Sequence, residues 1–171
     1  MEIIIKPIGY VKSELKTSSF QEDVPIHIKK EKSRLKYHKI KNTISELVID
    51  IQYEDMLDGV ETFSHIIVIY WPHLLSDEQK KLRKVHPMGR KDLPEQGIFA
   101  TRSPARPNSI LISSVELLER KKNILKVKGL EALDGSPILD IKTVIQINDD
   151  IENPTFPDWV YQIQKDLRKE N

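Results

Sequence analysis

The run from Gly97 to Ser113, GIFATRSPARPNSILIS, holds the side chains best suited to chemistry in this sequence. Two arginines, an asparagine and several hydroxyl groups stand between apolar stretches that are typical of strands. Pro104 and Pro107 fix their own φ and push the residues before them towards extended geometry. Because such a loop is stiff, its polar side chains lose little entropy when they bind a ligand. We therefore predict a ligand site here; the alternative is a rigid connector between two strands.

Two more segments combine turn residues with polar groups. Residues 134–137 read Asp-Gly-Ser-Pro, in which the aspartate can bond its own backbone, the glycine allows positive φ and the proline blocks further strand pairing. Residues 59–65, Gly-Val-Glu-Thr-Phe-Ser-His, form a turn that feeds an apolar strand. Taken alone, the segment 134–137 is an ordinary turn.

Several chemistries have no support in the sequence. It contains no cysteine, which excludes disulfides, thiolate catalysis and cysteine-based metal sites. It has no glycine-rich phosphate loop and no G-x-S-x-G motif, so Ser103 is a poor candidate for a nucleophile. Of the five histidines, His65 and His73 would stand about 26 Å apart along an extended strand. That distance is too long for one ion, and we predict no metal site.

The charge of the chain is balanced overall but not locally. The formal net charge is +1, which argues against steering of the whole molecule to nucleic acid. Between Lys29 and Lys41, however, basic residues far outnumber the single acid Glu31, and Tyr37 and His38 lie among them. A stripe of this kind can follow a phosphate backbone. The alternative is a solvated or edge strand whose lysines discourage aggregation.

The elements that must position these segments are mostly strands. Apolar or alternating runs predict strands at residues 3–5 with 8–11, 45–53, 65–71, 110–118, 124–130 and 138–147. The run 65–71 is almost continuously apolar, which predicts a central strand buried on both faces. Helices are expected at 76–84 and from about 157 to 170, and a short turn at 54–57.

Many short strands with little helix between them favour a mainly β fold, a small closed or nearly closed β-barrel with short helices and a C-terminal helix. The 171 residues are expected to form a single domain, 1–171. No apolar run approaches the length of a membrane span, and the first apolar run is too short for a signal peptide. We therefore expect a cytoplasmic protein with no membrane partner.

The three polar segments together resemble the TsaA-like (YaeB/TrmO) family. That family shows a G-x-x-x-FSH segment, a G-[VI]-FATRS-x-x-RPN-P-IGLS loop, an L-x-x-LDGTP-[VI]-x-DIKPY segment and an I-G-x-[VI]-x-S opening. The corresponding runs here are 59–65, 97–113, 130–144 and 8–13. The chain departs from the pattern where residues 109–113 replace P-IGLS and where Thr143-Val144 replaces P-Y.

The resemblance implies a small β-barrel that binds S-adenosyl-L-methionine and acts as a homodimer. It implies N6-methylation of threonylcarbamoyladenosine at position 37 of tRNA, in the anticodon loop. Longer members carry a second, C-terminal domain, and this chain looks like the short form. The family's cofactor contacts map onto Thr101, Arg102, His73, Leu74, Ile112, Gly135, Ser136, Pro137 and Ile138. A further contact maps onto His27, in the segment where Pro25-Ile26-His27 replaces the family's P-R-Q.

For the methyl transfer we predict that Asp134, beside the cofactor turn, is the general base. The N6 atom of a carbamoylated adenine is a poor nucleophile until its proton is removed or shared, and a carboxylate can accept that proton. Asp140 is the second candidate. The alternative role for Asp134 is to shape its own turn.

The substrate side of the site is assigned to the other half of the loop. Arg106, or Arg102, is expected to hold the threonyl carboxylate through paired hydrogen bonds, with Asn108 beside it. The basic stripe 29–41 would contact the anticodon stem, and Tyr37 would stack on an unpaired base. Two other functions stay open: a methyltransferase of the same barrel type acting on another substrate, and a non-catalytic dimeric module that binds RNA or a small ligand.

Overall fold

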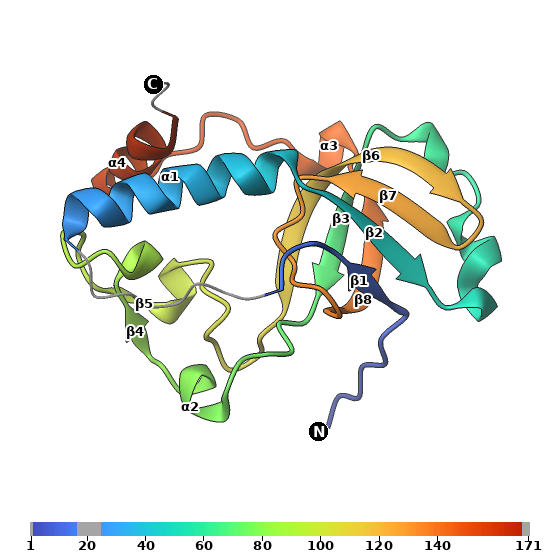
Figure 1. Cartoon of the computed structure of the whole chain (residues 1–171), viewed down its shortest axis with the longest axis horizontal. Coiled ribbons are helices and arrows are strands. Elements are labelled where there is room, and N and C mark those ends of the chain that lie inside the picture. Colours follow the sequence, from blue (N-terminus) through green and yellow to red (C-terminus); the bar gives the residue numbers. More distant parts are fainter. Residues whose placement is uncertain (1, 17–24, 169–171) are drawn as a thin grey trace.

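A computed structural model of the chain describes residues 2–16 and 25–168 and contains a closed barrel of six strands (Figure 1). The strands are neighbours in the order β1-β2-β7-β6-β3-β8, and every pair is antiparallel. Their bounds are β1 Gly9–Lys12, β2 Ile44–Ile49, β3 His65–Tyr70, β6 Leu111–Lys121, β7 Ile124–Lys128 and β8 Pro137–Thr143. The prediction of a small, mainly β barrel is confirmed.

The barrel is filled by alternate side chains of its strands. β2 and β3 each bury every second residue, so Leu47, Ile49, Ile66 and Val68 point into the core. The prediction that residues 65–71 are buried on both faces is wrong, since Ile67 and its alternate neighbours are only half-buried and His65 is exposed. In a closed barrel one face of each strand points inward and the other points away from the axis.

The strand predictions are confirmed for most segments and fail at their ends. The hairpin expected after residue 110 is β6 and β7, joined at Lys122, which has positive φ. Residues 3–5 are exposed and lie outside the sheet. The strand expected over 45–53 ends at Ile49, and the 3-10 helix η1, Ile51–Leu57, follows it. The strand expected over 138–147 ends at Thr143, and the short helix α3, Gln146–Asp149, follows it.

The basic stripe forms a helix, α1, from Ile26 to Asn42, so the alternative of an edge strand is wrong. The segment is rich in lysine and contains neither glycine nor proline, a composition that favours helix. It buries no residue fully and has no strong apolar face, which is why periodicity did not reveal it. Figure 1 shows α1 running away from the barrel with its N-terminal end farthest from the strands.

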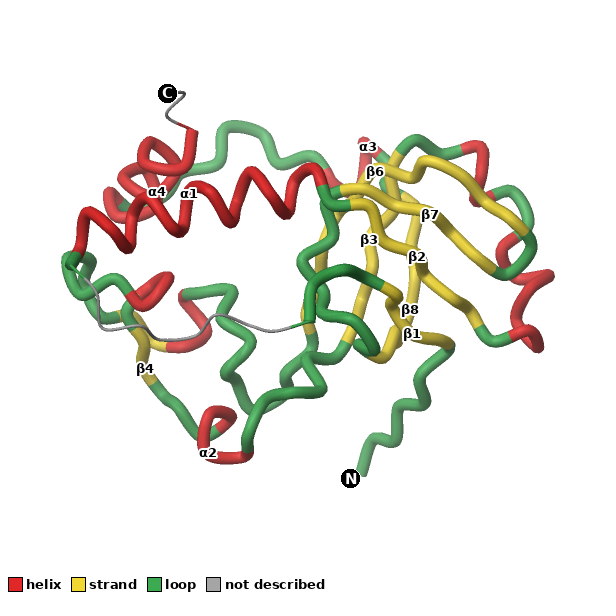
Figure 2. Tube along the Cα trace, viewed as in Figure 1, coloured by secondary structure: helices red, strands yellow, loops and turns green. Residues whose placement is uncertain are grey.

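A second group of elements lies beside the barrel and beneath α1 (Figures 1 and 2). It contains α2, Asp77–Lys80, whose start Ser76 and Gln79 cap reciprocally. The helix predicted over 76–84 is therefore wrong beyond Lys80, because residues 81–83 are not helical and Lys84 pairs with Gly97 in a short strand. It also contains a short strand pair, β4 Lys84–Val85 with β5 Gln96–Gly97, and the 3-10 helices η3 Pro87–Gly89 and η4 Ile98–Ala100. The C-terminal helix α4 spans Asp158–Arg168, close to the predicted range, and packs beside α1.

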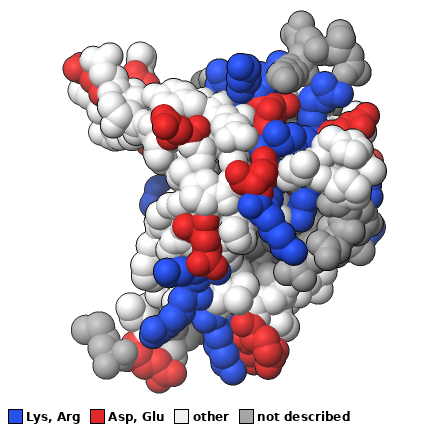
Figure 3. Space-filling view, turned by 90° about the vertical axis from the view of Figure 1, so that its left-hand side faces the viewer, with Lys and Arg blue, Asp and Glu red and all other residues white. Residues whose placement is uncertain are grey.

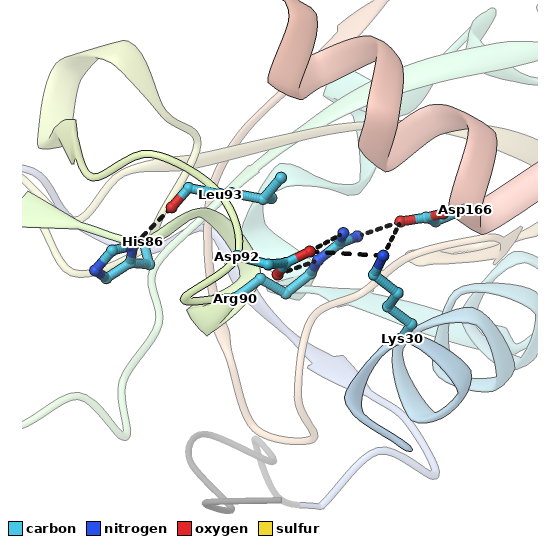
Figure 4. Close-up of polar contacts among 6 residues, drawn as sticks. All are labelled: Lys30, His86, Arg90, Asp92, Leu93 and Asp166. Atoms are coloured by element: carbon cyan, nitrogen blue, oxygen red, sulfur yellow. Dashed lines mark hydrogen bonds and ion pairs between the residues drawn. The ribbon is translucent and has the colours of Figure 1, made fainter. Parts of the chain in front are cut away.

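A buried arginine joins these outer elements (Figure 4). Arg90 follows η3 and is 1% exposed. Its Nε and Nη2 atoms donate to the two carboxylate oxygens of Asp92 at 3.1 and 2.8 Å, and its Nη1 lies 2.7 Å from Oδ2 of Asp166 in α4. Lys30 of α1 places its Nζ 3.6 Å from both carboxylates. One ion network therefore fixes α1, α4 and the segment after η3 against one another.

Candidate functional site

The Asp-Gly-Ser-Pro turn lies at the start of β8, where its backbone is hydrogen-bonded to β1. The backbone N–H of Gly135 donates to the carbonyl of Val11 at 2.8 Å, and the N–H of Val11 donates to the carbonyl of Ser136 at 2.9 Å. Gly135 has φ +75°, as a turn glycine requires. The positive φ predicted for this turn is therefore present.

His73 approaches this turn from the end of β3. Its Nδ1 lies 3.4 Å from the Oγ of buried Ser136, and the N–H of Trp71 donates to the carbonyl of Pro137 at 2.9 Å. A Cβ atom on Gly135 would stand 3.6 Å from Nε2 of His73, in ordinary van der Waals contact. The structure thus brings together four of the predicted cofactor residues, His73, Gly135, Ser136 and Pro137.

The loop 97–113 joins the same region through the register of β3. Tyr70, the last residue of β3, pairs with Ile138 of β8 on one side and with Leu111 of β6 on the other. Next to Leu111, the carbonyl of Ile112 accepts a hydrogen bond from Nη2 of exposed Arg102 at 2.7 Å. Arg102 and Ile112 are therefore in direct contact, one strand away from the turn at 134–137.

Arg106 turns its guanidinium towards its own loop. Nε donates to the carbonyl of Ser103 at 2.8 Å, and Nη2 donates to the carbonyls of Ile98 and Thr101. The buried hydroxyl of Ser109 donates to the carbonyl of Arg106 at 2.9 Å. These hydrogen bonds stiffen the loop, as its two prolines also do. The substrate role of Arg106 stays a prediction, and this geometry favours a role in positioning Thr101 and Arg102.

Asp134 is held by two partners from the segment after β1. Its Oδ1 accepts from the N–H of Ser13 at 2.9 Å, and its Oδ2 lies 2.6 Å from Nζ of Lys16. The carboxylate of Asp134 is thus bonded to a segment that is distant in the chain, whereas the sequence predicted a bond to the backbone of its own turn. The ammonium of Lys16, followed by the N–H of Ser13, lowers the pKa of Asp134. A lowered pKa weakens a general base, so the geometry supports the turn-shaping alternative as well.

The remaining predicted residues are more scattered. Leu74 and Asn108 are exposed, and Ile138 is fully buried in the barrel core, so its side chain faces away from a ligand at the surface. Asp140 lies on the outside of β8, opposite Ile69, with its Oδ2 3.0 Å from Nζ of Lys142.

His27 is in the first turn of α1, exposed, at the end away from the barrel (Figure 1). An α-helix rises 1.5 Å per residue, so His27 stands about 22 Å along the axis from Asn42, where α1 meets the barrel. Within one chain, His27 does not reach the turn at 134–137.

Tyr70 is a buried polar residue next to the candidate site that the sequence did not single out. It is 2% exposed, and its hydroxyl lies 3.4 Å from Oγ of Ser113. Burial raises the pKa of Tyr70, and the charge of Glu131 raises it further, while Ser113 and Arg102 act in the opposite direction. The raised pKa keeps the phenol protonated at neutral pH. A tyrosine at the end of an apolar strand, before Trp71-Pro72, was the available signal.

These features define a closed antiparallel barrel with a polar site where β3, β6 and β8 meet, a different class from the parallel-sheet nucleotide-binding folds. Among the described residues, no three carboxylate or histidine side chains are placed to share a metal ion. None of the helices over 2–16 and 25–168 has the length and apolar character needed to cross a membrane.

Comparison with known proteins identifies the family. The sequence model of the family described as tRNA-methyltransferase O N-terminal domain matches residues 25–150. A probable S-adenosyl-L-methionine-binding protein of Methanothermobacter thermautotrophicus is 43% identical, covering 83% of this chain and 90% of its own. An S-adenosyl-L-methionine-binding protein of Archaeoglobus fulgidus is 44% identical over 82% of this chain and 88% of its own.

The fold agrees with this family. A crystal structure of TrmO superposes with a TM-score of 0.66 at 25% identity, covering 91% of this chain and 64% of the TrmO chain. A crystal structure of TrmO from Pseudomonas aeruginosa gives a TM-score of 0.65, covering 91% of this chain and 62% of its own. The chain spans a little under two thirds of these TrmO chains. It belongs to the family of tRNA-methyltransferase O N-terminal domains.

Proposed function

We propose that the protein is an S-adenosyl-L-methionine-dependent methyltransferase that methylates N6 of threonylcarbamoyladenosine at position 37 of tRNA. The observation that carries the proposal is the meeting of the turn 134–137, His73 and the Arg102–Ile112 contact at the end of β3. Its family membership and the S-adenosyl-L-methionine-binding relatives support the cofactor. The tRNA substrate rests on the family description and on the sequence resemblance.

The residues at this site suit the cofactor chemically. Arg102 is exposed and offers a cation for the carboxylate of the cofactor. Gly135 carries no side chain beside the His73 ring, and both residues are exposed, so a ligand can approach the backbone of the turn from solvent. His73 and the backbone of the turn offer hydrogen-bonding groups for its hydroxyls. When bound, the cofactor supplies a methyl group on a sulfonium whose leaving group is a neutral thioether.

The protein's own contribution is positioning together with control of one proton. The loop clamped by Arg106 and the turn bonded to residues 11–15 are stiff, as alignment of two reacting groups requires. Asp134 is the carboxylate closest in sequence to the cofactor turn, and we propose that it accepts the N6 proton. Its carboxylate is ionised at neutral pH, and Lys16 lowers its pKa further below the ordinary value of 3.8.

Asp134→Asn separates the two roles of this carboxylate. The amide oxygen can still accept from Ser13, so the turn is preserved, while the base is lost. We expect the methylation rate to fall about 100-fold or more with cofactor affinity unchanged. Asp140→Asn tests the second candidate for the base, and it should keep normal activity because Asp140 lies on the outside of β8 beside Lys142. Loss of cofactor affinity in parallel with the rate would mean that Asp134 only shapes the turn.

Lys16→Met provides the pH test of the same proposal. Without the ammonium, the pKa of Asp134 rises towards its ordinary value of 3.8. The acidic limb of the pH profile of kcat/KM should therefore move to higher pH, because the ionised carboxylate is the active form. An acidic limb that stays at the wild-type pH would contradict the assignment of Asp134 as the base.

We also propose a homodimer in which the cofactor site is completed by a second copy. The resemblance places a cofactor contact at His27, which one chain holds far from the turn, so His27 of the partner subunit must supply it. Exposed apolar residues on the outside of β6, Ile112 and Leu118, are available for a subunit contact. Mixing His27→Ala and Arg102→Ala subunits should restore about a quarter of the activity, since half the dimers are mixed and each has one intact site. No recovery, with a monomeric mass by light scattering, would reject the dimer.

Mass spectrometry of tRNA nucleosides tests the function itself. Incubation of unmethylated tRNA with protein and S-adenosyl-L-methionine should convert threonylcarbamoyladenosine to its N6-methyl form. Calorimetry with the cofactor alone is the companion measurement. Cofactor binding without tRNA methylation would favour the same fold acting on another substrate, which the altered residues 109–111 permit. Absence of cofactor binding would favour a non-catalytic module.

A further inference from the structure

A groove of about 890 Å³ lies outside the barrel, between α2 and the start of the loop 97–113. One wall is formed by α2 and the residues after it, and the other by η4. The cofactor residues Thr101 and Arg102 directly follow η4 in the chain. The groove therefore adjoins the candidate site but contains none of the residues predicted to hold the cofactor.

Phe99, in the middle of η4, is 80% exposed in this groove. Its backbone is fixed, because the N–H of Ile98 donates to the carbonyl of Arg83 at 2.9 Å and the N–H of Thr101 donates to the carbonyl of Ile98 at 3.2 Å. Arg106 adds its bonds to Ile98 and Thr101. A phenyl ring so exposed adds little to the core, yet it is carried on a rigid support. Such a ring is a preorganised stacking surface.

The opposite wall is basic. Among the residues that the structure describes, Lys80, Lys81 and Arg83 line the groove together with one acid, Asp77. The Nζ of Lys80 lies 2.9 Å from Oδ1 of Asp77, while Lys81 and Arg83 are exposed. A cationic wall facing an aromatic ring is the pattern that binds single-stranded nucleic acid, because the cations neutralise phosphates and the ring stacks on an unpaired base.

The basic charge is local. On the face of the molecule seen in Figure 3, Lys and Arg groups lie next to Asp and Glu groups and form no continuous basic field. With a net charge of +1, long-range attraction cannot supply the affinity for RNA. A groove whose described lining holds three cations and one carboxylate gives RNA a defined place to bind.

We propose that this groove binds the single-stranded nucleotides next to the target base, with Phe99 stacking on one base and Lys81 and Arg83 contacting phosphates. The inference rests on the proposed RNA substrate, and it adds a surface that the cofactor residues do not include. It accounts for Phe99, Lys81 and Arg83 together, whereas a purely apolar contact would leave the two exposed cations without a role.

Fluorescence anisotropy with an anticodon stem-loop RNA, measured on the full chain, tests the groove. Phe99→Ala should weaken binding of the stem-loop roughly tenfold and leave binding of a blunt RNA duplex and of S-adenosyl-L-methionine unchanged. Phe99→Trp should retain affinity. Met56→Ala is the matched control, because Met56 is also a highly exposed apolar residue but lies on η1.

The charged wall has its own readout. The double variant Lys81→Gln with Arg83→Gln should reduce the salt dependence of stem-loop binding by about 0.7 in log–log slope for each phosphate that the protein no longer neutralises. Lys126→Gln, on an exposed position of β7, should leave the slope unchanged.

Unchanged RNA affinity in Phe99→Ala overturns the proposal, and a change of molar mass in that variant would then assign the ring to subunit association. If Phe99→Ala weakens RNA binding but the wild-type protein methylates no tRNA, the proposed reaction is rejected while the groove remains an RNA-binding surface.

Discussion

Arg90→Ala is expected to lower the free energy of unfolding by about 3 to 5 kcal/mol. The guanidinium is almost fully buried and meets two carboxylates, Asp92 and Asp166. Its hydrogen bonds hold the pKa of Asp92 below the ordinary value of 3.8. Removing it leaves the carboxylates of Asp92 and Asp166 close together without the guanidinium that both of them contact, beside the ammonium of Lys30. Urea unfolding at neutral pH measures the loss.

Two variants give this experiment its controls. Arg90→Lys keeps a positive charge but cannot bond both oxygens of Asp92 in the forked geometry, so it should fall between wild type and alanine. Lys126→Ala removes an exposed cation from β7 and should change the free energy of unfolding by less than about 0.5 kcal/mol. A loss in Arg90→Ala no larger than in Lys126→Ala would show that the network does not hold α1 and α4 in place.

Gly9→Ala is expected to cost about 3 kcal/mol of stability, at the upper end for an overpacked site. A Cβ atom at this position would stand 2.2 Å from the carbonyl oxygen of Val48 and 2.8 Å from the Cα of Ile49. Both are backbone atoms, and β1 is paired with β2 on one side and β8 on the other at this residue. The strand therefore cannot move away without opening the barrel.

Gly97→Ala is the matched control for Gly9→Ala. A Cβ atom at Gly97 meets nothing within 4 Å, and its φ is negative, so alanine should be neutral or add up to about 1 kcal/mol through the unfolded state. Thermal or urea unfolding compares the two variants directly. Equal stability of both proteins would contradict the close approach of β1 to β2. A large loss in Gly9→Ala alone would explain why a glycine stands in the I-G-x-[VI]-x-S opening.

Much of the barrel could be predicted because strands leave a local signal. Alternating or apolar runs located β2, β3, β6, β7 and β8 within a few residues, and Ser76 with its acidic neighbours located α2. Helix α1 was missed for a physical reason. Its residues are polar on nearly all sides and it is held by contacts with α4 and the Arg90 network, which are distant in the sequence.

The sequence by itself determined which segments carry the candidate site and which turns they form. Proline and glycine restrict φ within one or two residues, so the stiff loop 97–113 and the turn 134–137 are local properties. Only the tertiary structure decided where the side chains point. Tyr70 joins Leu111 and Ile138 through strand register, Lys16 takes up the carboxylate of Asp134, and Arg106 folds back on its own loop. These contacts depend on the tertiary fold, which brings together residues that are far apart in the chain. The loop Gly97–Ser113 therefore presents Arg102 and Phe99 to solvent, while Arg106 is bonded within the loop.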